Sequence, residues 1–419
     1  MTRATEPTAE VLCKVLGPDR PVALVAYDGS RSGPADADVE LDIRSRKALS
    51  YLVTSPGELG LARAYVSGEL DVHGDIYTGL RYLARARIGD LTWGERMRLL
   101  RSLDPKALRY VEPPAEEAPA VLRRVLSGLR HSKRRDSQAI SHHYDVSNKF
   151  YEWVLGPSMA YTCAVFPRED ATLEEAQYEK FDLVARKLGL TEGMRLLDVG
   201  CGWGGMVMHA AKHYGVKAVG VTLSLQQAEW AQKAIADEGL SDVAEVRHSD
   251  YRDVTEADFD AVSSIGLTEH VGKRELPPYF EFLCSKLRPQ GRLLNHCITR
   301  PTTTERARAG GFIDRYVFPD GELLGVGHIV SVMQNHGFEV RHEENLREHY
   351  AKTLASWCAN LDAHWDEAVQ EVGEGRARVW ALYMAGSRLG FEQNKIQLHQ
   401  VLGVRTADGA SGMSLRPSW

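Results

Sequence analysis

The segment from Arg195 to Gly205, RLLDVGCGWGG, constrains this chain more than any other, because a short apolar run ends there in a glycine-rich turn. The leucines and valine before the turn favour a β-strand, and residues 206–212 continue in a helical pattern. The glycines permit a tight turn and let a ligand approach the backbone closely. The segment therefore predicts a strand, a turn and a helix. Gly200, Gly202 and Gly205 also satisfy G-x-G-x-x-G, so a dinucleotide site is one interpretation.

The residues around this turn separate two kinds of nucleotide site. A dinucleotide fold places an acid at the end of its second strand, about 20 residues beyond the glycines, to bind a ribose hydroxyl. Here Thr222 ends the predicted second strand. Asp198 instead lies two residues before Gly200, where it can contact the turn and the polar end of a ligand. The pattern D-x-G-x-G-x-G, which Asp198 begins, favours S-adenosylmethionine. Such methyltransferases usually carry the second-strand acid too, so how the ribose is bound stays open, and a turn that binds nothing is the alternative.

Composition and cysteine usage exclude several classes of protein. The 419 residues are enough for two or three domains, and the six cysteines are scattered without a C-x-x-C pair, which favours neither a disulfide framework nor a zinc site. A net charge of −6 argues against general nucleic-acid binding. No apolar run reaches the ~18 residues of a membrane span, and the N-terminal segment lacks the apolar core of a signal peptide. We therefore expect a cytoplasmic protein without a metal site.

The first part of the chain predicts a small mixed α/β domain. Strand-like patterns in VALVAYDGSRSGP and VELDIRS are separated by a turn, and residues 56–109 have apolar side chains at helical spacing. Residues 81–109 are also basic, with eight Lys or Arg against three acids, interleaved with aromatic and aliphatic side chains. Such an amphipathic stretch can lie on anionic lipid headgroups. A solvated helix face over an ordinary core is the alternative.

A change of composition marks the end of this domain. Residues 112–120, EPPAEEAPA, are rich in proline, alanine and acid, as interdomain linkers are. A second basic cluster follows at residues 123–135, and it too can contact lipid phosphates or stay solvated. We therefore predict an N-terminal lipid- or membrane-associated domain at 1–111, a linker and basic segment at 112–137, and a larger domain at 138–419.

From Leu173 onwards, helical and strand patterns alternate regularly. Such alternation predicts an α/β fold with a doubly wound, mainly parallel sheet, whose ligands bind at the carboxyl ends of the strands. The five predicted strands end at Asp198, Thr222, Asp250 with Tyr251, Glu269 with His270, and His296 with Ile298. The sequence thus predicts one site along this edge of the sheet.

Several motifs, in this order, resemble those of one enzyme family. They are HHYDVSNKFY, MAYTCAVF, DVGCGWGG, GVTLSLQQ, SIGLTEHVG, NHCIT and EHYAKTL, within residues 138–400. Together they resemble the cyclopropane fatty acid synthase and mycolic acid methyltransferase family. The resemblance implies a class I (Rossmann-like) S-adenosylmethionine methyltransferase domain. Its members alkylate a carbon of a cis double bond in an acyl chain, usually one esterified in a phospholipid.

A finer resemblance implies the product. The N-terminal half and the segment RHSKRRD, residues 130–136, are similar to long actinobacterial members that make methyl-branched (tuberculostearic-type) fatty acids. This similarity implies a 10-methylene product on phospholipid-bound oleoyl chains, with a separate reductase to saturate it. Cyclopropane formation is the close alternative. The implied partners are unsaturated phospholipid acyl chains and the anionic inner face of a membrane, with no nucleic acid and with a homodimer left open.

The resemblance also implies which residues form the site. It implies a bicarbonate ion held near the reacting carbon by Cys163, Glu269, His296, Tyr350 and the backbone amide of Ile298. The residues implied for S-adenosylmethionine, with Asp198 added from the glycine motif, are Tyr161, Thr162, Asp198, Gly200, Gly202, Thr222, Gln227, Asp250, Tyr251 and Arg252. The shorter mycolic enzymes carry a tryptophan and an acid at the last two positions, so the adenine contacts stay open. Taken singly, Cys163 is also typical of a small buried residue, and His296 of a core histidine.

Other functional classes fit parts of this pattern. A small-molecule or nucleic-acid N- or O-methyltransferase would share the nucleotide-binding half but needs no cluster of cysteine, glutamate, histidine and tyrosine. A nicotinamide oxidoreductase is disfavoured by Thr222, and a non-catalytic lipid-binding protein would need only the basic stretches. The cluster favours carbon methylation, because methyl transfer to an alkene leaves a carbocation that needs a base and protection from water.

Overall fold

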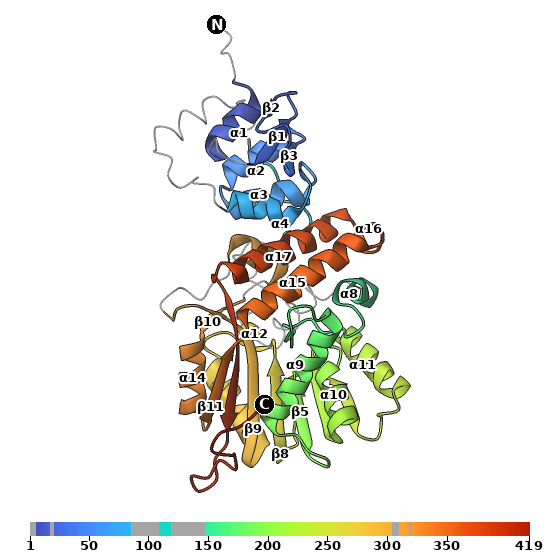
Figure 1. Cartoon of the computed structure of the whole chain (residues 1–419), viewed down its shortest axis with the longest axis vertical. Helices are drawn as coiled ribbons and strands as arrows, with labels where there is room; N and C mark the ends of the chain where they lie inside the picture. Colours follow the sequence, from blue (N-terminus) through green and yellow to red (C-terminus); the bar gives the residue numbers. More distant parts are fainter. Residues whose placement is uncertain (1–5, 17–20, 85–108, 119–146, 304–309, 319–320) are drawn as a thin grey trace. The chain divides into compact units, whose positions relative to one another are not determined.

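A computed structural model describes the chain except residues 1–5, 17–20, 85–108, 119–146, 304–309 and 319–320 (Figure 1). Backbone contacts divide the protein into two compact units. The first comprises Met1–Pro119, Gly310–Val317 and Trp365–Leu389, and the second comprises Ala120–Ala309, Phe318–His364 and Gly390–Trp419. Most of the predicted basic stretch at 81–109, and all of the cluster at 123–135 with RHSKRRD, lie outside the described residues.

The two units differ from the predicted division in one respect. Two segments from the later part of the chain belong with the first unit, although the sequence pattern had assigned them to the larger domain. Ion pairs inside the first unit accompany this arrangement: Arg315 pairs with Glu117 at 2.9 Å, and Arg378 pairs with Asp71 at 3.0 Å. The Glu117 side chain is 1% exposed, so its pairing is a buried one. The functional domain boundaries at 112–137 stay a prediction.

The first unit is built on a four-stranded sheet in the order β2-β1-β3-β4. β1 and β3 pair in parallel, and the other two pairs are antiparallel. The elements of this unit are β1 (Val22–Ala26), β2 (Arg31–Ser32), β3 (Val39–Ile43), β4 (Leu70–His73), α1 (Thr8–Leu16), α2 (Arg46–Thr54), α3 (Glu58–Val66), α4 (Ile76–Leu83), η4 (Ile313–Val317), α16 (Trp365–Val372) and most of α17 (Glu374–Glu392). Every second residue of β3 is buried, and these side chains form a core with β1 and α2. The predicted mixed α/β domain is confirmed.

The second unit contains an eight-stranded sheet, in which seven strands follow the order β11-β12-β9-β8-β5-β6-β7 and β10 pairs with β9. Neighbours from β9 to β7 are parallel, whereas β12 runs antiparallel to both β9 and β11. The strands are β5 (Arg195–Val199), β6 (Lys217–Thr222), β7 (Ala244–His248), β8 (Phe259–Ile265), β9 (Leu287–Arg300), β10 (Leu324–Gly325), β11 (Glu339–Asn345) and β12 (Gln397–Val404). The predicted doubly wound, mainly parallel sheet is confirmed, and the antiparallel pair is an addition to it.

Helices cover both faces of this sheet (Figure 1). Leu196 of β5 packs among residues of α9, α10 and α11, whereas Leu197 packs on the opposite face among residues of α13 and α14. The helices are α8 (Asn148–Leu155), α9 (Leu173–Leu188), α10 (Gly205–Tyr214), α11 (Leu225–Asp237), η3 (Tyr251–Asp253), α12 (Thr268–Val271), α13 (Leu276–Lys286), α14 (Val326–Asn335) and α15 (Arg347–Ala363). None of the described helices has the length and apolar character needed to cross a membrane.

Helix α9 carries polar side chains into the interior. It begins with a capping box, in which Thr172 and Glu175 satisfy each other's backbone N–H groups. Its buried face includes Gln177, Lys180 and Lys187, which are three and seven residues apart and therefore share one side of the helix. Lysine is almost never fully buried unless it is paired. The two buried lysines therefore mark a polar region beneath the apolar core.

Candidate active site

The glycine turn between β5 and α10 forms one wall of the site. Gly200 and Gly202 have φ angles of +71° and +54°, in the left-handed region that strains a residue with a Cβ atom. The N–H of Gly200 bonds to the carbonyl of Val221 at 2.9 Å, which ties the turn to β6. A Cβ atom added to Gly202 would meet no atom within 4 Å. The turn therefore leaves open space directly against the backbone, as the sequence predicted.

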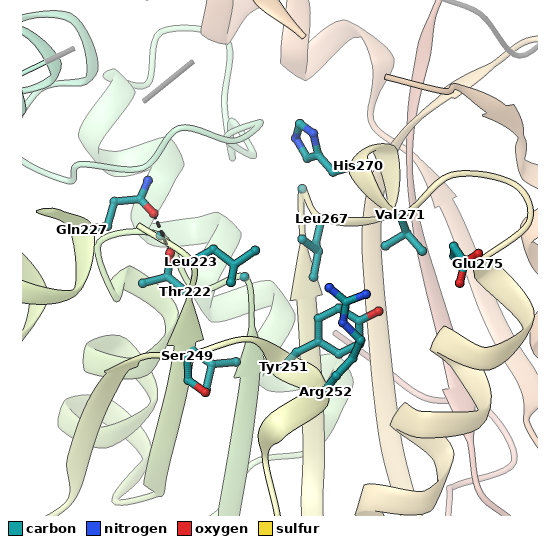
Figure 2. Close-up of a pocket in the computed structure, with 14 residues that line it drawn as sticks. Thr222, Leu223, Gln227, Ser249, Tyr251, Arg252, Leu267, His270, Val271 and Glu275 are labelled. Carbon is teal, nitrogen blue, oxygen red and sulfur yellow. Dashed lines mark hydrogen bonds between the residues drawn. The ribbon is translucent and has the colours of Figure 1, made fainter. Parts of the chain in front are cut away.

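A hollow of about 810 Å³ opens beside this turn, at the carboxyl ends of the parallel strands (Figure 2). Six of the residues predicted for S-adenosylmethionine line it: Gly200, Gly202, Thr222, Gln227, Tyr251 and Arg252. Thr222 Oγ1 donates a hydrogen bond of 2.8 Å to Gln227 Oε1, which fixes the orientation of this amide (Figure 2). Leu267, Val271 and Glu275 line the hollow across from this pair.

A second hollow, of about 540 Å³, adjoins the first, since the two share the lining residues Gly200, Gly202, Gln227 and Gly266. Three more of the predicted residues line it: Tyr161, Thr162 and Asp198. Tyr161 and Thr162 come from the segment before α9, and the side chain of Gln177 bonds to the carbonyl of Thr162 at 2.9 Å. The segment that carries Tyr161 and Thr162 is thus held against the site by a buried glutamine of α9.

Asp250 lines neither of these two hollows. It is buried at the start of η3, where Oδ1 accepts a hydrogen bond of 2.8 Å from Arg252 Nε and Oδ2 accepts one of 2.6 Å from Arg252 Nη2. This two-pronged contact holds the guanidinium 5.4 Å from the centre of the Tyr251 ring. Asp250 therefore shapes the first hollow through Arg252, and its predicted direct contact with S-adenosylmethionine stays a prediction.

Two buried charged groups face the second hollow. Asp198 accepts a hydrogen bond of 2.6 Å from Ser263 Oγ, and burial raises the pKa of its carboxyl to about 7. Lys180 donates from Nζ to Thr162 Oγ1 at 3.0 Å, and burial lowers the pKa of its ammonium to about 7. Charges that are removed from water interact strongly with a bound ion. An acid and a base at one hollow suit the ammonium and the carboxylate of an amino-acid group.

A buried carboxyl group and a buried imidazole lie next to the end of β8. The backbone N–H of Ile298 donates to Glu269 Oε1 at 2.7 Å, and burial raises the pKa of the Glu269 carboxyl to about 7. His296 precedes Ile298 by two residues on β9, so both project toward the same face of the sheet. Glu269 Oε2 and His296 Nε2 are both buried and have no hydrogen-bond partner among the described residues. Buried polar atoms rarely stay unpaired in a protein, so this pair marks a place for a polar ligand.

Cys163 and Tyr350 meet at the beginning of α15. The Cys163 thiol is buried and donates to the carbonyl oxygens of Ala164 at 3.2 Å and Leu346 at 3.8 Å, and burial raises its pKa. The backbone N–H of Tyr350 bonds to the same Leu346 carbonyl at 3.2 Å. The Tyr350 ring packs 4.5 Å from the ring centre of Phe391. The five predicted anion-site residues thus form two groups, Glu269 with His296 and Ile298, and Cys163 with Tyr350.

The comparison with known families agrees with this geometry. Residues 131–401 match the family described as mycolic acid cyclopropane synthetase, and this range contains every predicted site residue. The chain belongs to the mycolic acid cyclopropane synthetase family. S-adenosylmethionine is the methyl donor of this family. The fold, the glycine turn and the two adjoining hollows are therefore those of an S-adenosylmethionine-dependent methyltransferase that acts on fatty acids.

Individual members of the family differ in how much of this chain they match. A probable fatty acid methyltransferase of Mycobacterium tuberculosis is 56% identical over 406 residues, which is 95% of each chain. The cyclopropane-fatty-acyl-phospholipid synthase of Escherichia coli is 36% identical over 65% of this chain and 69% of its own. The solved structure of mycolic acid cyclopropane synthase CmaA1, complexed with SAH and CTAB, has a TM-score of 0.61 and 34% identity, covering 64% of this chain and 98% of its own.

The family resemblance missed some residues that line the site. Lys180 is one, although its position could have been noticed, because it repeats with Gln177 and Lys187 along the apolar face of a predicted helix. Leu267 is another, and its side chain lies 3.2 Å from where a Cβ atom on Gly200 would be. No local signal separates Leu267 from an ordinary core leucine, because only the turn after β8 brings it to the hollow.

Proposed function

We propose that this methyltransferase transfers the methyl group of S-adenosylmethionine to a carbon of the cis double bond in an oleoyl chain esterified in a phospholipid. The proposed product is a 10-methylene branched acyl chain. One observation carries the proposal: Glu269, a buried carboxyl with a pKa near 7, bonds the N–H of Ile298, which is two residues from His296, a buried imidazole with an unpaired nitrogen. A group with a pKa near neutrality can accept or donate a proton at physiological pH, so Glu269 suits a site where a bound base removes a proton.

Methylating an alkene explains why such a site must be dry. A carbon–carbon double bond is a weak nucleophile, so the enzyme must hold the sulfonium methyl close to it and in line. Methyl transfer forms a carbon–carbon bond, releases S-adenosylhomocysteine and leaves a carbocation, which water would convert to an alcohol. Cys163 and His296 are almost completely buried, as this requirement demands. A nitrogen or oxygen acceptor needs neither this exclusion of water nor a base for a carbon-bound proton.

The donor fits the two adjoining hollows. We propose that the glycine turn at Gly200 and Gly202 lets the donor lie against the backbone, and that Asp198 and Lys180 face the two charges of its methionine part. The residues proposed to bind S-adenosylmethionine are Tyr161, Thr162, Asp198, Gly200, Gly202, Thr222, Gln227, Tyr251 and Arg252, with Asp250 acting through Arg252. The proposal is supported because each of these residues lines one of the two hollows, except Asp250, which holds the side chain of Arg252.

The residues also fit a bicarbonate ion. The unpaired Glu269 Oε2 and His296 Nε2 offer a donor and, when Glu269 is protonated, a second hydrogen for an oxyanion. The Ile298 amide, Cys163 and Tyr350 would complete its surroundings. When bound, bicarbonate would supply a base next to the reacting carbon. The residues of the chain would position it and keep water away.

The product follows from what happens to the cation. A 1,2-hydride shift followed by loss of a methyl proton gives the exocyclic methylene, whereas loss of a methyl proton with ring closure gives a cyclopropane. Both products add one CH₂ to the chain. The relative that matches 95% of this chain is named a probable fatty acid methyltransferase, which supports methyl transfer to an acyl chain. The proposed methylene product rests on the resemblance of the N-terminal half to long family members that make methyl-branched fatty acids. The family description favours cyclopropane formation as the second candidate. Saturating the methylene would need a separate reductase with a hydride donor.

Proton NMR of the extracted fatty esters tests the proposal. The enzyme is incubated with S-adenosylmethionine and vesicles of dioleoyl phosphatidylglycerol, an anionic lipid that also suits the proposed peripheral association with the inner face of a membrane. Vinylidene protons support the methylene product, and upfield cyclopropane protons without them select the second candidate. If labelled methyl groups enter RNA or small amines and never the lipid, the proposed substrate class is wrong.

A further inference from the structure

A chain of buried polar side chains reaches His296 from the side of α9. The Lys187 side chain is 0% exposed, and its Nζ donates to Gln400 Oε1 at 2.7 Å and pairs with Glu344. Gln400 of β12 lies directly opposite His296 of β9 in the antiparallel ladder. The amide Nε2 of Gln400 is 3.2 Å from His296 Nδ1. Lys187, Gln400 and His296 are all buried, so water does not compete for these bonds.

The hydrogen-bond donors and acceptors of Lys187, Gln400 and His296 allow only one orientation of the Gln400 amide. A protonated ammonium has hydrogens to give and no lone pair, so Gln400 must turn its carbonyl oxygen toward Lys187. Burial lowers the pKa of the Lys187 ammonium, and the hydrogen bond and ion pair with Glu344 act in the opposite direction and favour its protonated form. The amide nitrogen of Gln400 then faces His296, and because an amide NH₂ only donates, His296 Nδ1 must accept. The reverse orientation of the amide would set its NH₂ against the ammonium, with two buried donors facing each other.

This arrangement determines where His296 carries its proton. Burial, together with the charges of Lys180 and Lys187, lowers the pKa of His296 well below its usual value, so the ring is neutral. A neutral imidazole has one N–H, and since Nδ1 accepts, that proton is on Nε2. Nε2 is the buried nitrogen for which no described group supplies a partner. His296 thus presents a fixed hydrogen-bond donor at Nε2, two residues before Ile298, whose N–H bonds Glu269.

We propose that Lys187 and Gln400 are positioning residues, which hold His296 with its ring proton on Nε2 so that it donates to an oxyanion in the active site. This inference rests on the proposed function, in which His296 helps to hold bicarbonate. The opposite tautomer would present a lone pair and repel the same ion. Lys187 and Gln400 do not contact the ion, so they act on it only through His296.

The nitrogen chemical shifts of His296 test the proposal without any assay of activity. The intact enzyme is labelled with ¹⁵N-histidine, and long-range ¹H–¹⁵N correlation spectra are recorded without S-adenosylmethionine or lipid. The His296→Gln variant is used to assign the signals. We expect a protonated Nε2 and an unprotonated, hydrogen-bonded Nδ1. A wild-type spectrum with the proton on Nδ1 overturns the proposal.

Two variants test the roles of the positioning residues. Gln400→Glu is nearly isosteric, but its carboxylate can only accept from His296, so the proton should move to Nδ1 and turnover should fall by ~10²–10⁴-fold with unchanged S-adenosylmethionine affinity. Lys187→Met frees the Gln400 amide to turn, so both tautomers should appear. Lys187→Arg keeps the donors and should restore the wild-type spectrum. Wild-type tautomers in both Gln400→Glu and Lys187→Met would overturn the positioning role.

A neighbouring histidine supplies the matched control. His399 precedes Gln400 on β12, is also buried, and bonds through Nδ1 to Thr299 Oγ1 at 2.7 Å. His399→Gln should leave the His296 signals and the turnover unchanged. If it changed them as much as Gln400→Glu does, the effect would not be specific to the hydrogen bonds that join Lys187, Gln400 and His296. If the predicted tautomer is found but no lipid is methylated, the proposed function fails, whereas the positioning of the His296 proton by Lys187 and Gln400 stands.

Discussion

Glu269→Gln should make this enzyme more stable at alkaline pH while removing most of its activity. Glutamine keeps the oxygen that accepts the Ile298 N–H at 2.7 Å, so the local backbone contact survives. It removes the carboxyl group whose pKa burial raises from 4.5 to about 7. Because the pKa is higher in the folded protein, the folded state keeps a proton that the unfolded chain releases. The free energy of unfolding therefore falls between pH 4.5 and about 7 and stays low above it.

The size of the effect follows from that difference in pKa. A difference of about 2.5 pH units corresponds to about 3 kcal/mol at 1.36 kcal/mol per unit. The advantage of Glu269→Gln over the wild type should thus be about 1 kcal/mol at pH 5 and about 3 kcal/mol at pH 8. Turnover should fall by about 100-fold or more, because the group acts on proton removal, while affinity for S-adenosylmethionine should not change.

Urea unfolding at pH 5 and pH 8 measures the stability, and calorimetric titration measures donor binding. Glu281→Gln is the control, because Glu281 is an exposed carboxyl on α13, and its substitution should shift stability by the same small amount at both pH values. Equal stability of Glu269→Gln and the wild type at pH 8 would show that folding does not raise the pKa of Glu269. Undiminished turnover would remove Glu269 from the catalytic group.

Three further predictions concern other parts of the chain. Gly200→Ala should cost about 1–2 kcal/mol, because Gly200 has φ +71°, and should weaken donor binding because its Cβ atom would lie 3.2 Å from Leu267; an unchanged melting temperature and affinity would contradict this. Cys163 should resist iodoacetamide at pH 8 until urea unfolds the protein, since its thiol is buried and neutral; mass spectrometry of the folded enzyme that finds it alkylated would refute the burial. Binding to anionic vesicles should weaken as salt rises if residues 81–109 and 123–135 contact lipid, because screening acts within ~8 Å at physiological ionic strength; equally strong binding to neutral vesicles in high salt would disprove that account.

The regular part of the fold could be predicted because each element has a clear period. The alternation of helical and strand patterns from Leu173 predicted helices between the parallel strands, and α11 over Leu225–Asp237 is one of them. The antiparallel strands β11 and β12 were not predicted, because their residues do not alternate in polarity. In β12 both His399 and Gln400 are buried on opposite faces, and a local pattern cannot reveal a partner for either. Nor could it assign Arg378 to the first unit, since its partner Asp71 is in a distant part of the sequence.

The site could be predicted in outline for a topological reason. Parallel strands bring their carboxyl ends to one edge, so Asp198, Thr222 and Glu269 fall near each other once the strands are identified. What connects His296 to Lys187 depends on the register between β9 and β12, and that register is a property of the folded sheet. Charge and hydrogen-bond direction in the interior could therefore be derived only after the structure was known.

The position of β12 has a consequence for how the protein is made. β12 comes last among the strands of its sheet, yet it lies between β9 and β11, where it pairs with Arg292–Thr299 of the 14-residue strand β9. On the ribosome about 100 residues separate the end of β9 from Gln397, which at ~5–20 residues per second is roughly 5–20 s of synthesis. During that interval β9 has an unpaired edge of the kind that recruits other chains. A chain that stalls or is cut before Gln397 should therefore aggregate, and cells that make this enzyme quickly should depend on chaperones that cover this edge until the last strand arrives.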